Sequence, residues 1–250
     1  MSKIDDYRKI LRSRAEWDDY LLAESGLPGP RGNLELARAV AYEGDLVTFR
    51  RYATYNAESA PVNSPYEFLA FSGVLGLGRL IAEGNVELVP ELRAHASDSR
   101  WRTREAVAMA VQWWGDADMP AVLEEMKKWA RGNLLERRAA VAALCEPRLL
   151  TVPEYVAATV AILDQVTAEV GQEEDRRSES FRALRQGLGY CWSVAVSAGP
   201  EIGKPAMERW FTDPDRDVQW IMRENLKKKR LERMDAAWVQ HARAVLTSTA

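Results

Sequence analysis

Histidine and cysteine are both scarce in this sequence, with two residues of each among 250. His95 and His241 supply too little imidazole for a histidine-based metal centre or a serine-type catalytic triad, although carboxylate-based catalysis stays open. Cys145 and Cys191 lie inside apolar helical patterns and lack the spacing of metal ligands. They are typical of small buried residues in a reducing compartment, so we expect neither a metal nor a cofactor.

Long apolar runs are missing as well. No uninterrupted run approaches the roughly 20 residues that a membrane helix requires, and the opening MSKIDDYRKILRSR lacks the apolar centre of a secretory signal. We therefore expect a cytoplasmic protein without membrane contacts. The formal net charge of −3 argues against wholesale coating of a nucleic acid but leaves room for one basic face. Because 47% of the residues are hydrophobic, a sizeable core is expected.

The sequence also lacks a convincing signal for β-strands, since no segment alternates polar and apolar residues with a period of two. Ser64, Pro65 and Glu67 instead predict a helix that begins with a capping box and a proline in its first turn. Glycine and proline forbid continued helix in residues 24–33 and 56–65. We predict helices near residues 3–23, 33–43, 46–58, 65–83, 86–96, 100–114, 120–131, 134–145, 152–170, 177–197, 201–211, 216–231 and 236–248.

A repeat emerges from these helices. The segment WRTREAVAMAV, which begins at Trp101, aligns at an offset of 34 with LERRAAVAALC, which begins at Leu135. Units of ~35 residues are the size of helical solenoid repeats. We predict an all-α fold, a right-handed α-α superhelix of about six HEAT-like, armadillo-like helical hairpins in a single domain over residues 1–250. A polar connection is expected near 167–180, and the concave face is expected to bind a macromolecule.

A shorter recurrence links DSRWRTRE, from Asp98, with DVQWIMRE, from Asp217. We interpret it as a packing module and not as a site used twice: aspartate for the turn, Trp101 or Trp220 for burial, and arginine for contacts between units. An arginine near a helix N-terminus opposes the helix dipole, so an ion pair to the turn aspartate of a neighbouring unit is its expected structural partner. Asp98 and Asp217 are the candidates for that partner.

The basic residues allow a second interpretation. Equivalent positions of stacked units line up along one surface, so the early arginines could form a row that binds phosphates or a partner instead of a ladder between units. The run KKKR is typical of a solvated helix end and also suits phosphates or an acidic partner. The candidate partner- or phosphate-binding residues are Arg100, Arg102, Arg104, Arg137, Arg138, Arg223, Lys227, Lys228, Lys229 and Arg230.

The segments DPDRDVQWIMREN and SDSRWRTREAVAMAV resemble HEAT-like repeats. The pieces QWWGDAD, EEMKKWARGNLLERRAAV and RENLKKKRLERMDAAWV resemble, more closely, the superfamily that contains the bacterial alkylated-base DNA glycosylases. That resemblance implies that Trp114 and Asp118 flank a damaged nucleotide while Arg138 holds the backbone. In such a site an aspartate stabilises the cationic sugar and an aromatic face stacks on the cationic base.

Asp118 also precedes Met119 and Pro120, where a helix start favours a carboxylate that caps backbone N–H groups. We therefore expect a non-catalytic scaffold that binds a protein or DNA, or a module that docks another enzyme. DNA glycosylase-like recognition or excision of alkylated bases through Trp114 and Asp118 is the alternative, and the sequence leaves open whether the protein is an enzyme.

Overall fold

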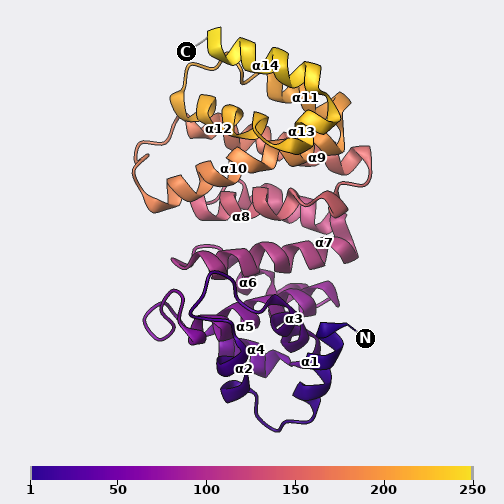
Figure 1. Ribbon diagram of the computed structural model, residues 1–250, viewed down its shortest axis with the longest axis vertical. Coiled ribbons are helices and arrows are strands. Elements are labelled where there is room, and N and C mark those ends of the chain that lie inside the picture. The colour runs from indigo at the N-terminus through magenta and orange to yellow at the C-terminus, as the bar shows by residue number, and fades with distance from the viewer. Residues whose placement is uncertain (1, 249–250) are drawn as a thin grey trace. The chain divides into compact units, whose positions relative to one another are not determined.

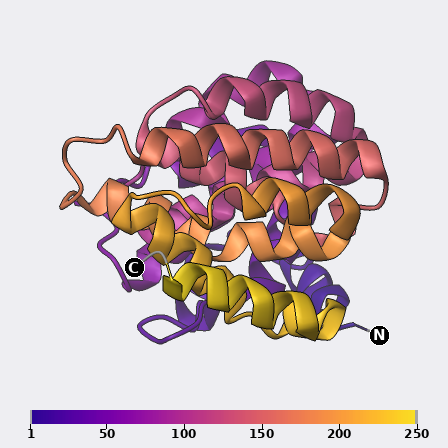
Figure 2. The ribbon, with the colours of Figure 1, turned by 90° about the horizontal axis from the view of Figure 1, so that it is seen from above.

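The computed structural model describes residues 2–248, and every regular element in that range is helical (Figure 1). The second view likewise contains coiled ribbons and connecting loops but no strand over the same residues (Figure 2). The α-helices are α1 (Lys3–Arg12), α2 (Asp18–Glu24), α3 (Leu34–Glu43), α4 (Leu46–Ala53), α5 (Pro65–Ala82), α6 (Val89–His95), α7 (Trp101–Trp129), α8 (Leu134–Leu144), α9 (Pro153–Val170), α10 (Glu179–Ala198), α11 (Pro200–Glu208), α12 (Arg216–Leu226), α13 (Lys229–Met234) and α14 (Ala236–Ser248). Two 3₁₀ turns complete the described structure, η1 (Val86–Leu88) and η2 (Pro147–Leu149).

The prediction of an all-α chain is confirmed, and most predicted helices have a counterpart. The helix expected over residues 3–23 is instead two helices, α1 and α2. Its interruption has a local cause, because side chains bond the carbonyls at the end of α1: Ser13 Oγ donates to Ile10 O at 2.7 Å and Trp17 Nε1 to Leu11 O at 3.0 Å. A side chain that bonds a backbone carbonyl competes with helix continuation.

The predicted helices over 100–114 and 120–131 are the two halves of α7. Asp118 separates them, since its φ of −149° and ψ of 78° are non-helical. The helix predicted over 216–231 also ends early, at Leu226, and α13 starts anew at Lys229.

The described chain divides into two compact units, residues 1–118 and 119–250. The boundary falls at Asp118, so the first half of α7 belongs to the first unit and the second half to the second unit. The expectation of one domain over the whole chain stays a prediction.

Helix α5 is the centre of the first unit. It packs against α2, α3, α4 and α6, and apolar residues surround it on nearly all sides. A helix that is apolar all round must be buried. Two of its glycines allow other helices to approach closely: a Cβ at Gly73 would lie 2.6 Å from Phe49 O, and one at Gly78 would lie 2.3 Å from Ala110 Cβ of α7.

Helix α10 has the same role in the second unit, where it packs against α8, α9, α11, α12 and α13. Trp192 is fully buried there, and its Nε1 donates to Thr167 Oγ1 of α9 at 3.0 Å. Val107 on α7 and Val141 on α8, which the sequence repeat aligns, are both helical and both fully buried. Each unit is thus a set of helices around one long central helix, which is compatible with a helical repeat fold.

Candidate functional site

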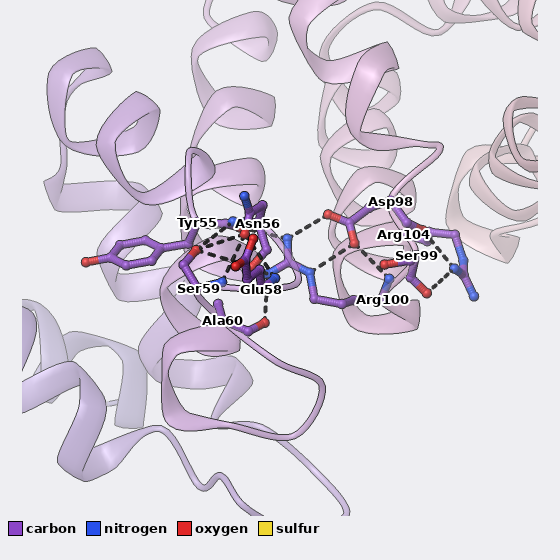
Figure 3. A network of polar contacts seen from close by, with 9 residues as sticks. All are labelled: Tyr55, Asn56, Glu58, Ser59, Ala60, Asp98, Ser99, Arg100 and Arg104. Carbon is purple, nitrogen blue, oxygen red and sulfur yellow. Dashed lines mark hydrogen bonds and ion pairs between the residues drawn. The ribbon is translucent and has the colours of Figure 1, made fainter.

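The start of α7 is held by a buried arginine (Figure 3). Arg100 is 1% exposed, and its guanidinium bonds Asp98 through two contacts, Nε to Oδ1 at 2.9 Å and Nη2 to Oδ2 at 2.6 Å. It also donates to three carbonyl oxygens of the loop after α4, those of Tyr55 (2.8 Å), Asn56 (3.3 Å) and Ala60 (3.1 Å). Arg100 therefore fastens this loop to the start of α7.

Asp98 and Arg104 complete this network. Arg104 Nη1 donates to the carbonyl oxygens of Asp98 and Ser99 at 2.8 and 2.7 Å. Burial alone raises the pKa of the Asp98 carboxyl, but the hydrogen bonds and charge of Arg100 together hold that pKa below its ordinary value. The carboxylate is thus ionised under neutral conditions and balances the buried guanidinium.

Arg102 joins α7 to two further segments. Its Nη1 donates to Glu67 Oε2 of α5 at 3.0 Å, and its Nη2 donates to Gly29 O at 2.8 Å and to Asn63 Oδ1 at 3.3 Å. Glu67 is fully buried. A buried pair of this kind fixes geometry, because removing either partner leaves an uncompensated charge inside the protein.

The predicted capping box at α5 is half formed. Ser64 Oγ accepts the Glu67 N–H at 3.4 Å, as expected. The Glu67 carboxylate does not accept the Ser64 N–H, which donates to Pro61 O instead. Glu67 Oε2 accepts the Asn63 N–H at 2.7 Å and the bond from Arg102. Asn63 has a φ of +67°, a left-handed conformation that asparagine tolerates better than most residues. The glutamate thus serves the loop before α5 as well as the helix.

Arg102 also lines an apolar cavity of about 270 Å³. One face of α7 forms a wall, since Trp101, Glu105 and Met109 follow at intervals of four residues. The remaining wall comes from the loop after α2, the start of α3, and α5. The lining residues are Leu27, Pro30, Arg31, Gly32, Leu34, Phe68, Phe71, Trp101, Arg102, Glu105 and Met109.

Trp101 differs from its prediction. The sequence pattern predicts a buried packing residue, whereas the side chain is 48% exposed at the edge of the cavity. The Arg102 guanidinium lies 4.5 Å from the centre of its ring, a cation–π contact that holds the ring in place. Because Arg102 is itself anchored on Glu67, an exposed aromatic ring is fixed beside an apolar hollow.

The two halves of the sequence recurrence occupy different positions. Asp98 precedes α7, and its Oδ1 accepts the Arg100 N–H at 2.7 Å, whereas Asp217 is the second residue of α12. The cap of α12 is Asp215, whose Oδ1 accepts the Asp217 N–H at 2.9 Å. Asp98 thus corresponds to Asp215 and not, as the letters align, to Asp217.

The ion pairs of these aspartates differ too. Asp217 accepts bonds from Arg185 of α10 at 2.5 Å and from Arg176 at 3.1 Å, which agrees with the expected pairing to a neighbouring element. Asp98 pairs with Arg100 in its own turn. Buried arginine contacts between α7, the loops and α5 therefore replace the expected ladder at this position.

Predicted basic residues of the second unit mainly contact neighbouring side chains. Arg137 pairs with Glu169 of α9 at 2.9 Å, and Lys227 with Glu224 at 2.5 Å. Lys228 and Arg230 lie over the exposed Tyr190 ring, at 5.8 and 4.7 Å from its centre, and Arg230 also donates to the tyrosine hydroxyl. Arg138 is half-buried on α8 and Lys229 is exposed. Their role toward phosphates stays a prediction.

Of the residues that the glycosylase resemblance singles out, Trp114 and Asp118 lie near the end of the first unit. The Trp114 side chain is 5% exposed, and its neighbour Trp113 stacks on Tyr42 of α3 with ring centres 5.8 Å apart. Asp118 is exposed and has the non-helical backbone of a capping position. Arg138 belongs to the second unit. A catalytic role for Trp114 and Asp118 stays a prediction.

Two absences concern only the part of the chain that the structure describes. No group of three or more His, Cys, Asp or Glu side chains there is placed to hold a metal ion. Nor does any described helix combine the length and apolarity needed to cross a bilayer. Cys145 and Cys191 are free and buried, as predicted from their apolar surroundings, and burial raises the pKa of the Cys145 thiol.

The cavity itself was not predicted from sequence. Leu27, Phe68 and Met109 belong to three segments that are distant in sequence, and only the spacing of Trp101, Glu105 and Met109 along one helix face could have indicated a common surface.

No family model matches the chain, and neither a curated protein nor a solved structure matches it. Fold and pocket together define an all-helical protein of many packed helices with an apolar pocket in its first unit.

Proposed function

We propose that the protein is a non-catalytic helical repeat protein whose first unit binds a partner protein by receiving one bulky apolar side chain in the cavity beside α7. The supporting observation is an apolar hollow with a fixed, exposed Trp101 at its edge. Its volume of about 270 Å³ lies just below the range for small-molecule pockets, which suits a single side chain.

The energetics fit an anchor of this kind. Binding energy at protein interfaces is concentrated in a few aromatic or apolar residues that fill pockets. An aromatic side chain that buries 150–250 Å² at about 25 cal/mol per Å² gains about 4–6 kcal/mol before the cost of association. Micromolar affinity corresponds to about −8 kcal/mol, so contacts around the anchor must supply the remainder and offset the cost of association.

Rigidity supports the proposal as well. Arg102 ties the loop before α3, which lines the cavity, to α7, so the pocket is formed before a partner arrives. A pre-formed site avoids the entropy cost of ordering loops on binding.

The HEAT-like character of the chain, its superhelical arrangement and its concave binding face belong to the same proposal. They rest on the 34-residue sequence repeat and on the burial of Val107 and Val141.

Peptide display on the immobilised full chain tests this function. We expect selected peptides to share one bulky apolar residue, Trp, Phe, Leu or Met, and to lose at least about tenfold in affinity when that residue is replaced by alanine. The variant Met109→Arg places a charge in the cavity and should weaken the same peptides about tenfold or more.

Tyr66→Ala is the matched control, since Tyr66 is an exposed aromatic residue of the same unit that does not line the cavity. Its affinity should stay within about twofold of the parent protein. Peptides without an apolar anchor, or equal losses in both variants, would contradict the proposal. Salt-sensitive binding of duplex DNA without any selected peptide would favour the nucleic-acid alternative instead.

A further inference from the structure

A second cleft lies in the second unit, between α12 and α14. It measures about 270 Å³. What we infer from this cleft is independent of the function proposed for the first unit. Its lining residues are Arg223, Leu226, Lys227, Arg243, Leu246 and Thr247. Three of these six side chains are cationic and none is acidic. Arg223 and Lys227 are among the predicted partner- or phosphate-binding residues, whereas Arg243 was not anticipated.

The two arginines are placed by reciprocal bonds to the helix ends. Arg243 of α14 donates through Nη2 to Leu226 O, the last residue of α12, at 2.7 Å. Arg223 of α12 donates through Nη2 to Leu246 O near the end of α14 at 3.2 Å, and to Gln219 Oε1 at 3.3 Å. Each arginine thus satisfies a carbonyl at the C-terminus of the other helix, which also orients its guanidinium.

These bonds leave much of each guanidinium uncommitted. A guanidinium carries five N–H donors, and the bonds given above use Nη2 of each arginine only. The Nε and Nη1 donors of both therefore stay available, within residues 2–248, for an acceptor in the cleft. Thr247 does not supply a donor, because its hydroxyl is used on Arg243 O at 2.8 Å.

The two guanidinium charges of the cleft are not balanced by carboxylates of the described residues. Among the described residues neither Arg223 nor Arg243 pairs with a carboxylate, and Lys227 pairs with Glu224 alone. The C-terminal dipoles of α12 and α14 offset about one charge in total. Over residues 2–248, two guanidinium charges against about one opposing charge from the helix dipoles leave a net positive charge, which favours an anion over a neutral or cationic ligand.

We propose that the α12–α14 cleft is an oxyanion-binding site for a ligand that carries a carboxylate or phosphoryl group on an apolar body. Guanidinium groups match the paired oxygens of both anions, with two parallel N–H···O bonds. Leu226, Leu246 and the aliphatic stems of Arg223 and Arg243 provide an apolar wall for the rest of the ligand.

Calorimetric titration of the full chain tests this site with four small probes. Phenyl phosphate and benzoate carry both features, inorganic phosphate lacks the apolar body, and benzyl alcohol lacks the charge. We expect phenyl phosphate or benzoate to bind at least about tenfold more tightly than the other two probes. The comparison between phenyl phosphate and benzoate tells which oxyanion is preferred.

Arg243→Gln should weaken the preferred probe about tenfold or more, because it removes a charged fork while keeping a polar side chain. Lys227→Gln is a second variant, since the Lys227 side chain is exposed and donates to neither of the carbonyls that the two arginines bond. We expect a loss of about threefold or more. The matched control is Arg233→Gln, which removes an exposed cation of α13 outside the cleft. Its affinity should remain within about twofold.

Thermal unfolding of each variant confirms that the protein is folded during the titration. Unchanged affinity in both Arg243→Gln and Lys227→Gln would overturn the proposal. So would an equal loss in Arg233→Gln, because that result indicates attraction to overall charge. Absence of binding by phenyl phosphate and benzoate alike would overturn it too.

Discussion

Arginine side chains at the start of α7 combine a carboxylate with backbone carbonyls as partners. Arg100 contacts Asp98 and three carbonyl oxygens of the loop after α4, and Arg102 contacts Glu67 and the loop before α3. One guanidinium with five donors can bond several loop carbonyls at once and so fix a loop to a helix. Arg102 thereby helps to shape the pocket that it lines, whereas Arg100 holds a loop that lies outside the lining.

Replacing Arg100 should therefore be costly. We expect Arg100→Ala to lower the free energy of unfolding by about 3–5 kcal/mol, because it leaves the half-buried Asp98 unpaired and removes the donors to the loop. Urea denaturation followed by circular dichroism measures this change. Arg38→Ala, which alters an exposed arginine of α3, should change it by no more than about 0.5 kcal/mol. Equal effects of the two variants would contradict the role assigned to Arg100.

The Asp98 carboxyl gives the same network a pH dependence. Its folded-state pKa is lower than the ordinary value, so ionised Asp98 contributes stability above about pH 4. That contribution is lost as the pH falls from about 4 through the folded-state pKa, where the carboxylate takes up a proton. We expect Asp98→Asn to lack this part of the pH dependence in urea titrations between pH 7 and pH 3.

Asp19→Asn, which changes an exposed carboxylate of α2, is the control for the pH series. Its stability profile should follow that of the parent protein. A parent profile that coincides with that of Asp98→Asn below pH 7 would contradict the assignment.

At the scale of elements, the arrangement of helices in the first unit depends on how closely they pack against α5. Gly78 lets α7 approach α5 until a Cβ at that position would lie 2.3 Å from Ala110 Cβ. Gly187 on α10 is different, because a Cβ there would meet its nearest atom, Arg138 Cγ, at an ordinary 3.5 Å. Two helical glycines thus have opposite tolerance for a methyl group.

The two substitutions should change stability in opposite directions. We expect Gly78→Ala to destabilise by about 1–3 kcal/mol, since overpacking outweighs the gain in helix propensity. Gly187→Ala should stabilise by about 0.5–1 kcal/mol, because it reduces the entropy of the unfolded chain without a clash. Thermal denaturation distinguishes them, and a stabilised Gly78→Ala would show that α5 and α7 do not approach so closely.

Element positions could be predicted from the sequence where caps and apolar periods agree, as at α5 and α8. The break after α1 could not, because it depends on where the Ser13 and Trp17 side chains find carbonyl partners. Glu67 is a related case: the capping pattern was correct for its N–H, but its carboxylate bonds Asn63 and Arg102. The Glu67–Arg102 contact joins residues distant in sequence, and neither it nor the choice of carbonyl by Ser13 and Trp17 is encoded in the apolar spacing.

At the scale of the whole molecule, the all-α class followed from the absence of strand signals and was confirmed. The two binding features were harder to predict. The apolar pocket combines a loop, α5 and α7, and the basic cleft combines α12 with α14, so each depends on which helices pack together. The basic residues were noticed as a set, but only the structure separates buried Arg100 from cleft-lining Arg223.

The pocket in the first unit is the central claim, and Met109 provides a direct probe of it. The protein contains seven methionines, and Met109 lines the cavity. In a methionine-methyl NMR titration with a display-selected peptide, we expect the Met109 signal to shift in proportion to occupancy while that of the fully buried Met126 in the second unit stays fixed. Saturable binding that leaves the Met109 signal unmoved would contradict the account.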